Sequence, residues 1–320
     1  MSPTMEERTA RASLTRLFEP GDVVGGKLIA KDGAHSALRI AIGAKPAHPF
    51  WDVSANELSH ALSRWHPRIH DLDPEKDLAT IERLGGGFLI PGDEHWPKAL
   101  DELPNAPWGL WFRGDITQGI PSPERTIALI GSRDSSAYGN QVASEMAFAL
   151  AQRGFCVSAG LGYGIEEIAH QSALAGFQGD GPATIAVTAG GLDRDWPSGT
   201  TELAASIRAG GLTLSEIPPG TAPSRTRFLE RNRIIAALAG VTCVVEARWR
   251  SGALNTAHRA LELGRAVGVV PGSTYSAQSA GCHRLLKNRA TTLVTDTQDL
   301  TELLATWSAD RIATASIPVV

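Results

Sequence analysis

Three residues that together can bind phosphate follow an apolar run near the middle of the chain. Residues 127–130 read Ile-Ala-Leu-Ile, and Gly131, Ser132 and Arg133 come directly after them. Glycine lets a ligand approach the backbone closely, a serine hydroxyl can donate a hydrogen bond, and a guanidinium can bind phosphate through two parallel bonds. The pattern is typical of a strand end that binds an anion.

A second pattern of this kind lies at residues 160–164. Gly160, Gly162 and Gly164 alternate with Leu161 and Tyr163 just before a helix-like segment. The first amides of a helix have no partner within the helix and favour anions, so we expect free amides to face a ligand here. The spacing G-x-G-x-G is not the G-x-G-x-x-G of a dinucleotide site.

Four more loops with glycine or small residues follow apolar runs, at 190–193, 215–221, 246–252 and 269–274. In the third of them Ser251 is a candidate N-cap and Gly252 permits close approach. Ligands of an open parallel sheet bind beyond the carboxyl ends of its strands. Six such loops at one edge predict a long anion-binding groove, which favours a polyphosphate or a nucleic acid over a small neutral ligand.

The charge distribution fits an anionic partner. Residues 221–290 contain eleven Lys or Arg and three Glu, a net charge of +8 in a chain whose net charge is −4. This asymmetry indicates either a local nucleic-acid contact or a set of solvated helix faces, and charge alone favours neither.

Other chemistry finds little support in the sequence. His170 lies among apolar and small residues and is interpreted as a structural histidine, and the neighbouring Glu166 and Glu167 point apart on a helix. The segment 21–28 resembles a P-loop but has Leu28 in place of Ser or Thr. We therefore predict no catalytic residues, no metal and no cofactor.

The cysteines and the hydropathy pattern indicate a cytoplasmic protein. Cys156, Cys243 and Cys282 are far apart and predict buried thiols. No apolar run reaches the roughly 18 residues of a membrane span, so none is expected.

The elements that must hold the loops form an α/β pattern from residue 126 onward. Continuous apolar strands predict a doubly wound, mostly parallel sheet covered on both faces. Strands are expected at 126–130, 156–160, 183–189, 212–216, 241–246, 266–270 and 292–295. Helices are expected at 138–153, 164–176, 198–209, 230–238, 253–264 and 281–289.

Four segments follow from this pattern. Residues 1–80 predict a small N-terminal helical domain, in which Ser54 and Glu57 have capping-box spacing. Residues 81–116 predict a connector whose Trp96, Trp108 and Trp111 pack against the main domain. Residues 117–300 are expected to form the α/β domain that carries the candidate anion-binding loops, and residues 301–320 a short tail.

The strand-end loops, taken together, resemble the DNA-processing protein A family, also called DprA or Smf. The matching stretches cover about residues 126–295 and include "IALIGSRDSSAYG", "VSAGLGYGIEEIAHQSAL", "FLERNRIIAAL" and "SGALNTAHRALELGR". The resemblance implies that residues 117–300 are an extended Rossmann-like DNA-binding domain, and the winged-helix domain that ends some family members is not expected here. It further implies a homodimeric single-stranded DNA-binding protein of natural transformation and recombination. Such proteins protect incoming strands and promote loading of the RecA recombinase.

The resemblance also implies residue roles. The arginine of the Gly-Ser-Arg turn contacts the DNA backbone in the family, so Arg133 inherits that role. Arg225, Arg231, Arg233 and Lys287 are expected helpers. The sequence departs from the family at Tyr163, which can stack on a base or pack against its own loop. Further departures lie at Leu229, His283 and Arg289.

Two alternatives use the same crevice. One is a nucleotide-binding sensor, and the other is a nucleoside-monophosphate hydrolase. The Pro-Gly-Gly-x-Gly-Thr signature of such hydrolases is absent from this sequence, and Glu246 at a strand end is the one acid that could take part in hydrolysis.

Overall fold

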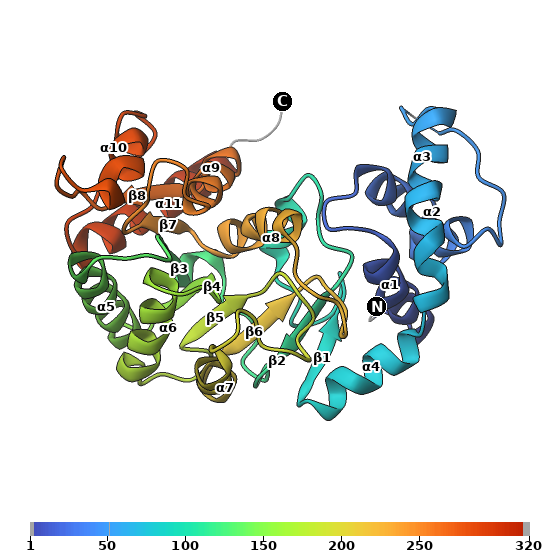
Figure 1. Cartoon of the computed structure of the whole chain (residues 1–320), viewed down its shortest axis with the longest axis horizontal. Helices are drawn as coiled ribbons and strands as arrows, with labels where there is room; N and C mark the ends of the chain where they lie inside the picture. Colours follow the sequence, from blue (N-terminus) through green and yellow to red (C-terminus); the bar gives the residue numbers. More distant parts are fainter. Residues whose placement is uncertain (1–2, 51, 316–320) are drawn as a thin grey trace. The chain divides into compact units, whose positions relative to one another are not determined.

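The computed structural model describes residues 3–50 and 52–315 (Figure 1). The chain forms two compact units. The first holds the chain up to Arg113 together with Ala189–Arg194 and Leu214–Glu230. The second holds Gly114–Thr188, Asp195–Thr213 and the chain from Arg231 onward.

The first unit is mainly helical. Its helix α3 begins as predicted, because Ser54 and Glu57 form a capping box in which each side chain accepts from the other residue's amide. The P-loop-like segment 21–28 forms the start of helix α2, which Asp22 caps. Among the described residues from 3 onward, the element before α2 is the helix α1 and not a strand. The elements are α1 (Met5–Leu17), α2 (Val23–Ala41), α3 (Ala55–Trp65), α4 (Pro74–Arg83), β1 (Gly86–Leu89) and β2 (Leu110–Arg113).

The tryptophans of the predicted connector pack with these N-terminal helices. Trp108 joins the cluster of Phe18 and Trp65, whose rings lie 4.2 Å apart between centroids. Trp111 packs with Phe88 in a second cluster and donates to the Thr15 hydroxyl at 3.3 Å. Trp108 therefore packs with the N-terminal helices, whereas the cluster of Trp111 also contains Leu192 from the predicted main domain.

The second unit contains a parallel sheet in the order β5-β4-β3-β7-β8-β9. The chain runs outward from β3 to β5 and then returns to β7 on the other side of β3, which is a doubly wound arrangement. Its strands are β3 (Thr126–Ile130), β4 (Cys156–Gly160), β5 (Thr184–Val187), β7 (Val241–Val244), β8 (Ala266–Val269) and β9 (Thr292–Leu293). Strand β6 (Leu212–Ser215) and helix α8 (Arg225–Leu238) run from one unit into the other. The predicted α/β fold class is confirmed.

Helices cover both faces of this sheet. Ile127 and Leu129 alternate along β3 and pack with Met146 and Leu150 of α5, while Figure 1 shows α9 on the opposite face from α5 and α6. The three cysteines are buried thiols, as predicted. The remaining helices are α5 (Ala137–Gln152), α6 (Ile165–Gly176), α7 (Thr201–Gly210), α9 (Ala253–Glu262), α10 (Ala280–Leu286) and α11 (Thr297–Ala315).

Two helices differ from the sequence prediction. Helix α8 begins at Arg225 rather than 230, because the Ser224 hydroxyl accepts from the Arg227 amide at 3.2 Å and starts the helix earlier. Residues 301–315 of the predicted short tail belong to the helix α11, and residues 316–320 lie outside the described part of the chain. Leu300, Leu304 and Trp307 of this helix follow a helical period and are buried in the core of the sheet.

Candidate nucleic-acid interface

The loops after β3 and β7 lie at the point where the strand order reverses. β3 pairs with β4 on one side and with β7 on the other. Such a switch point is where open α/β sheets bind ligands. The Gly-Ser-Arg turn follows β3 directly, so the structure places it at this position.

The Gly-Ser-Arg turn is held by the loop after β7. The Ser132 amide donates to the Glu246 carbonyl at 2.7 Å, and the buried Ser132 hydroxyl donates to the Asp134 carbonyl at 3.0 Å. A Cβ on Gly131 would lie 2.6 Å from Ile165 Cγ1. Gly131 and Ser132 therefore shape the turn, whereas Arg133 is the exposed member of the three. We correct the expected direct ligand contact of the Ser132 hydroxyl, because it is buried and already bonded.

The Glu246 carboxylate occupies the N-terminus of α5. It accepts from the Ser136 amide at 2.8 Å and from the Ser136 hydroxyl at 2.6 Å. A Cβ on Gly139 would lie 2.3 Å from the carboxylate, so a larger residue there would have to displace the Glu246 side chain. A helix N-terminus stabilises negative charge, and here the protein's own side chain supplies it.

The second glycine loop interlocks with the first. The Ile165 amide donates to the Ser132 carbonyl at 3.2 Å, and the Gly162 amide donates to the Glu166 carboxylate at 2.9 Å. Gly164 has φ +72°, and its Cβ would lie 2.4 Å from the Ser132 carbonyl. The expectation of free amides in this loop is wrong for these two amides, because a neighbouring turn and a local carboxylate already satisfy them.

A cluster of charges lies beside this loop. Arg133 Nε is 3.7 Å from the position of a Cβ on Gly162, the residue bonded to Glu166. Beneath the loop Arg231 is buried and donates to the Val187 carbonyl, and a Cβ on Gly160 would collide with its guanidinium. Burial lowers the pKa of Arg231, and Arg133 adds to this effect while Glu166 opposes it. The buried Arg231 thus lies beneath the second loop, which in turn is bonded to the turn that carries the exposed Arg133.

His170 is a structural residue, as predicted. It is fully buried, with Nε2 2.7 Å from the Gly160 carbonyl and Nδ1 2.7 Å from the Thr184 hydroxyl. A carbonyl can only accept, so Nε2 carries the proton and the ring ties β4 to β5. Burial lowers the pKa of His170.

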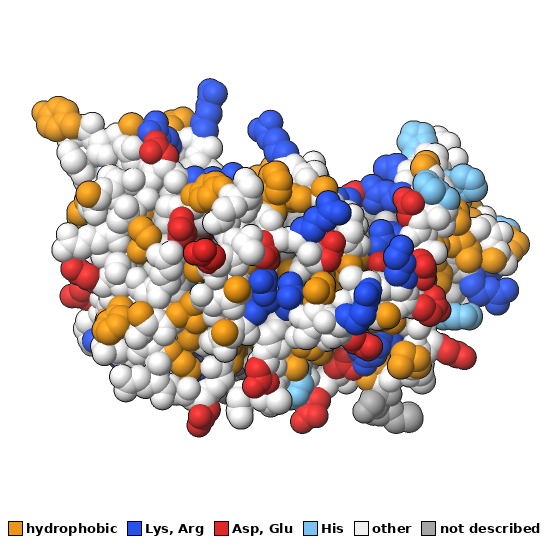
Figure 2. Space-filling model, turned by 60° about the horizontal axis from the view of Figure 1, so that its bottom comes forward, with side chains coloured by type: hydrophobic (Ala, Val, Ile, Leu, Met, Phe, Trp, Pro, Cys, Tyr) orange, Lys and Arg blue, Asp and Glu red, His pale blue; other side chains and the backbone are white. Residues whose placement is uncertain are grey.

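The basic stretch divides into buried and exposed residues. Arg231 and Arg233 are only 7% and 5% exposed, which argues against the expected direct phosphate contact of either residue. In the first unit Arg227 is paired with Glu19 through two bonds of 2.8 and 2.9 Å. Figure 2 shows basic and acidic side chains interspersed over the face it displays. The net charge of +8 on residues 221–290 therefore overstates the cationic surface that this stretch exposes. The predicted helpers Arg225 and Lys287 are exposed, the first in the first unit and the second in the second.

The loop after β7 leads to α9 through Ser251 and Gly252. The N-cap of α9 is Gly252 rather than Ser251, whose hydroxyl accepts from the Ala253 amide at 3.3 Å.

Tyr163 of the second glycine loop is 40% exposed, and its hydroxyl donates a hydrogen bond to the Ser198 carbonyl.

One residue of this loop has no place in the sequence-based site. Trp249 is 57% exposed, and the Arg284 guanidinium of α10 lies over its ring at 5.2 Å from the centroid. An apolar residue between two arginines was the available signal.

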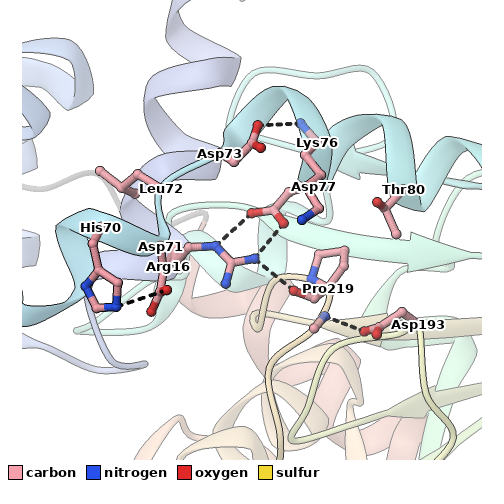
Figure 3. A pocket seen from close by; sticks show the side chains of 11 residues that line it. Arg16, His70, Asp71, Leu72, Asp73, Lys76, Asp77, Thr80, Asp193 and Pro219 are labelled. Carbon is pink, nitrogen blue, oxygen red and sulfur yellow. Dashed lines mark hydrogen bonds and ion pairs between the residues drawn. The ribbon is translucent and has the colours of Figure 1, made fainter.

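The first unit has a cavity of about 620 Å³, lined by residues that include Arg16, Asp77, Asp193 and Gly220 (Figure 3). Arg16 donates to Asp77 at 2.5 and 2.9 Å and to the Pro219 carbonyl at 2.8 Å. Asp193 accepts from the Gly220 amide at 2.6 Å. Because these charged groups bind one another, we assign the cavity no ligand.

Metal sites and membrane spans are both absent from the described part of the chain. Within residues 3–50 and 52–315, no group of His, Cys, Asp and Glu has the arrangement of a metal site. No helix among the described residues is long and apolar enough to cross a membrane.

The fold and the loops define a Rossmann-like α/β protein whose switch point carries an exposed arginine on a braced turn. The family described as DNA recombination-mediator protein A matches residues 87–305. The chain belongs to this family.

Relatives of known name agree with this assignment. A DprA protein of Mycobacterium tuberculosis is 41% identical over 239 residues, which cover 71% of this chain and 60% of that protein. The chain thus spans about 60% of the length of that relative. The Bacillus subtilis DNA processing protein DprA is 30% identical over 260 residues, covering 81% of this chain and 80% of the relative.

Solved structures match as well. DprA from Streptococcus pneumoniae superimposes with a TM-score of 0.70 at 26% identity, covering 94% of this chain and 98% of that one. DprA from Helicobacter pylori, for which a single-stranded DNA binding mode has been described, gives a TM-score of 0.60 at 28% identity, covering 68% and 95%.

Proposed function

We propose that the chain binds single-stranded DNA without sequence preference, through its phosphates, at the carboxyl edge of the sheet in the second unit. The observation that carries the proposal is Arg133, an exposed guanidinium on a turn fixed at the switch point. The described DNA binding of the H. pylori relative supports the choice of ligand. Contacts to phosphate alone make binding sequence-independent and sensitive to salt.

Arg133 is the principal phosphate ligand in this proposal. Gly131, Ser132, Gly160, Gly162 and Gly164 act indirectly, because they allow the two loops to interlock and so fix the direction of Arg133. Lys287 remains a proposed helper in this unit, whereas Arg225 belongs to the first unit and stays a prediction from the family resemblance. Ser251 and Gly252 remain proposed members of the site at the start of α9, and Tyr163 offers its exposed part to a base.

The cellular role follows from family membership. We propose that the protein acts in DNA processing for natural transformation and recombination, in the cytoplasm and as a homodimer. There it protects incoming single strands and promotes RecA loading. The family match and the named relatives support this role.

The nucleotide-sensor and hydrolase alternatives receive no support from Glu246. Its carboxylate is bonded to Ser136 at the N-terminus of α5, where a mononucleotide phosphate would otherwise be expected. A residue engaged as a helix cap is poorly placed to act as a general acid.

The test is fluorescence anisotropy with a labelled single-stranded oligonucleotide over a range of salt concentrations. Arg133→Ala is expected to weaken binding about five- to twentyfold, equally for different sequences. The slope of log affinity against log salt should fall by roughly 0.7 for each phosphate that the variant no longer neutralises.

Arg153→Ala is the matched control. Arg153 is also exposed and belongs to the same unit, but it ends α5 and therefore lies at the opposite edge of the sheet. The control should bind like the wild type, and duplex DNA should bind more weakly to all three proteins. Equal affinity and equal salt slope for Arg133→Ala and the wild type would contradict the proposal.

A further inference from the structure

Trp249 lies on an exposed segment in which its neighbours are cationic. The residue is 57% exposed, and both chain neighbours, Arg248 and Arg250, are exposed arginines. Arg248 is paired with Asp134 of the loop after β3, and the side chains of both keep more than half of their surface exposed. The segment therefore starts at the switch point itself.

The position of Arg284 over the indole is fixed by backbone contacts. The Gly281 amide of α10 donates to the Ala247 carbonyl at 2.7 Å, and the Ala247 amide donates to the Gln278 carbonyl at 2.8 Å. A Cβ on Gly281 would lie 2.7 Å from the Ala247 and Arg248 carbonyls, so only glycine allows this approach. Arg284 follows one turn later, which places its guanidinium 5.2 Å from the centre of the Trp249 ring.

The surroundings of the indole favour a nucleic acid over an apolar partner. A protein interface has an apolar centre from which charged residues are depleted. Here the Arg284 guanidinium lies over the indole, the chain neighbours Arg248 and Arg250 are exposed, and Lys287 is exposed at the end of α10. An aromatic face with cations around it is the arrangement by which proteins bind a base and its flanking phosphates.

We propose that Trp249 is a base-stacking residue for single-stranded DNA, oriented by Arg284 and flanked by Arg248, Arg250 and Lys287 as phosphate ligands. This proposal rests on the proposed function and extends its binding surface from the Gly-Ser-Arg turn to α10. It adds contact with the faces of the bases to contact with the phosphates.

Two oligomers of equal length separate the two kinds of contact. One is oligo-dT, and the other is the same backbone with abasic sites in place of the bases. Trp249→Ala should weaken binding of oligo-dT roughly five- to hundredfold and leave binding of the abasic oligomer unchanged. Trp249→Phe, which keeps an aromatic face, should restore most of the affinity for oligo-dT.

Phe148→Ala is the matched control. Phe148 is a 38% exposed aromatic near the end of α5, away from the strand-end loops, and its removal should change neither affinity. The oligomeric state of each variant is measured by light scattering. An unchanged affinity for oligo-dT, an equal loss for both oligomers, or dissociation of an oligomer in Trp249→Ala would each overturn the stacking proposal. If the wild type binds neither oligomer, the proposed function itself fails.

Discussion

Two neighbouring regions of the second unit use their polar residues in opposite ways. The interlocked loops, residues 131–136 and 160–166, turn their amides and carboxylates toward one another. The Trp249 arm, residues 247–250 with Arg284, turns its charged and aromatic groups toward solvent. Only Arg133, among the three residues of the Gly-Ser-Arg turn, is exposed.

The difference shows that glycine has a packing role here. Side chains on Gly131, Gly160 or Gly164 would each collide with another part of the protein. The density of glycine at the strand ends therefore reflects how closely the loops pack, and the exposed polar groups are the few side chains that project beyond them.

The strongest test of this comparison is Gly164→Ala. The substitution combines a positive φ with a contact of 2.4 Å to the Ser132 carbonyl, so we expect a loss of about 3 kcal/mol in the free energy of unfolding. Urea unfolding followed by circular dichroism measures it.

Gly252→Ala is the control for this variant. Gly252 has φ −61° and no atom within 4 Å of its would-be Cβ. Its substitution should be neutral or stabilising by up to about 1 kcal/mol. Equal effects at both glycines would show that the loops do not interlock as described.

A second test uses pH. Burial lowers the pKa of His170 in the folded protein, so the unfolded state binds more protons at mildly acidic pH. Stability from this group is present above the unfolded pKa of about 6.5 and is lost as pH falls toward the folded pKa, by up to about 1.4 kcal/mol per unit.

The pH effect is measured by comparing urea unfolding of the wild type and His170→Gln between about pH 7 and pH 5. The variant should show a shallower decline, and exposed His258→Gln should keep the wild-type slope. A decline of the same steepness in His170→Gln would mean that the buried ring does not tie β4 to β5 in its neutral form.

The smallest effect is expected in the Trp249 arm. Arg284→Met removes the guanidinium over the indole but leaves the Gly281–Ala247 hydrogen bond intact. Because the arm is exposed, the free energy of unfolding should change by less than about 0.5 kcal/mol. A loss comparable to that of Gly164→Ala would show that the arm is part of the folded core.

Much of the fold could be predicted from local patterns. The predicted bounds of strands β3 and β4 agree with the observed bounds, because runs of mainly apolar residues that end at a glycine are typical of buried parallel strands. The sequence does not predict helix α11, because the burial of Leu300, Leu304 and Trp307 depends on the sheet core that they cover. Likewise, the partners of Trp108 lie far away along the chain.

The site could be predicted less well. The position of Arg133 followed from the strand end, but sequence gives no measure of burial for Arg231 and Arg233 on a helix with no clear apolar face. The roles of Glu246 and Glu166 as acceptors for loop amides depend on three-dimensional pairing, which spacing along the chain does not encode. The sequence does not identify Trp249 as a site residue, because its partner Arg284 lies on helix α10, far along the chain.

The Glu246 carboxylate has a consequence for the protein in a cell rich in nucleotides. ATP and related metabolites compete for any open phosphate site at a helix N-terminus. A covalently attached anion has a high effective concentration and cannot diffuse away. With Glu246 bonded to Ser136, the N-terminus of α5 already holds an anion that belongs to the protein, so a free phosphate would have to displace this carboxylate to bind there.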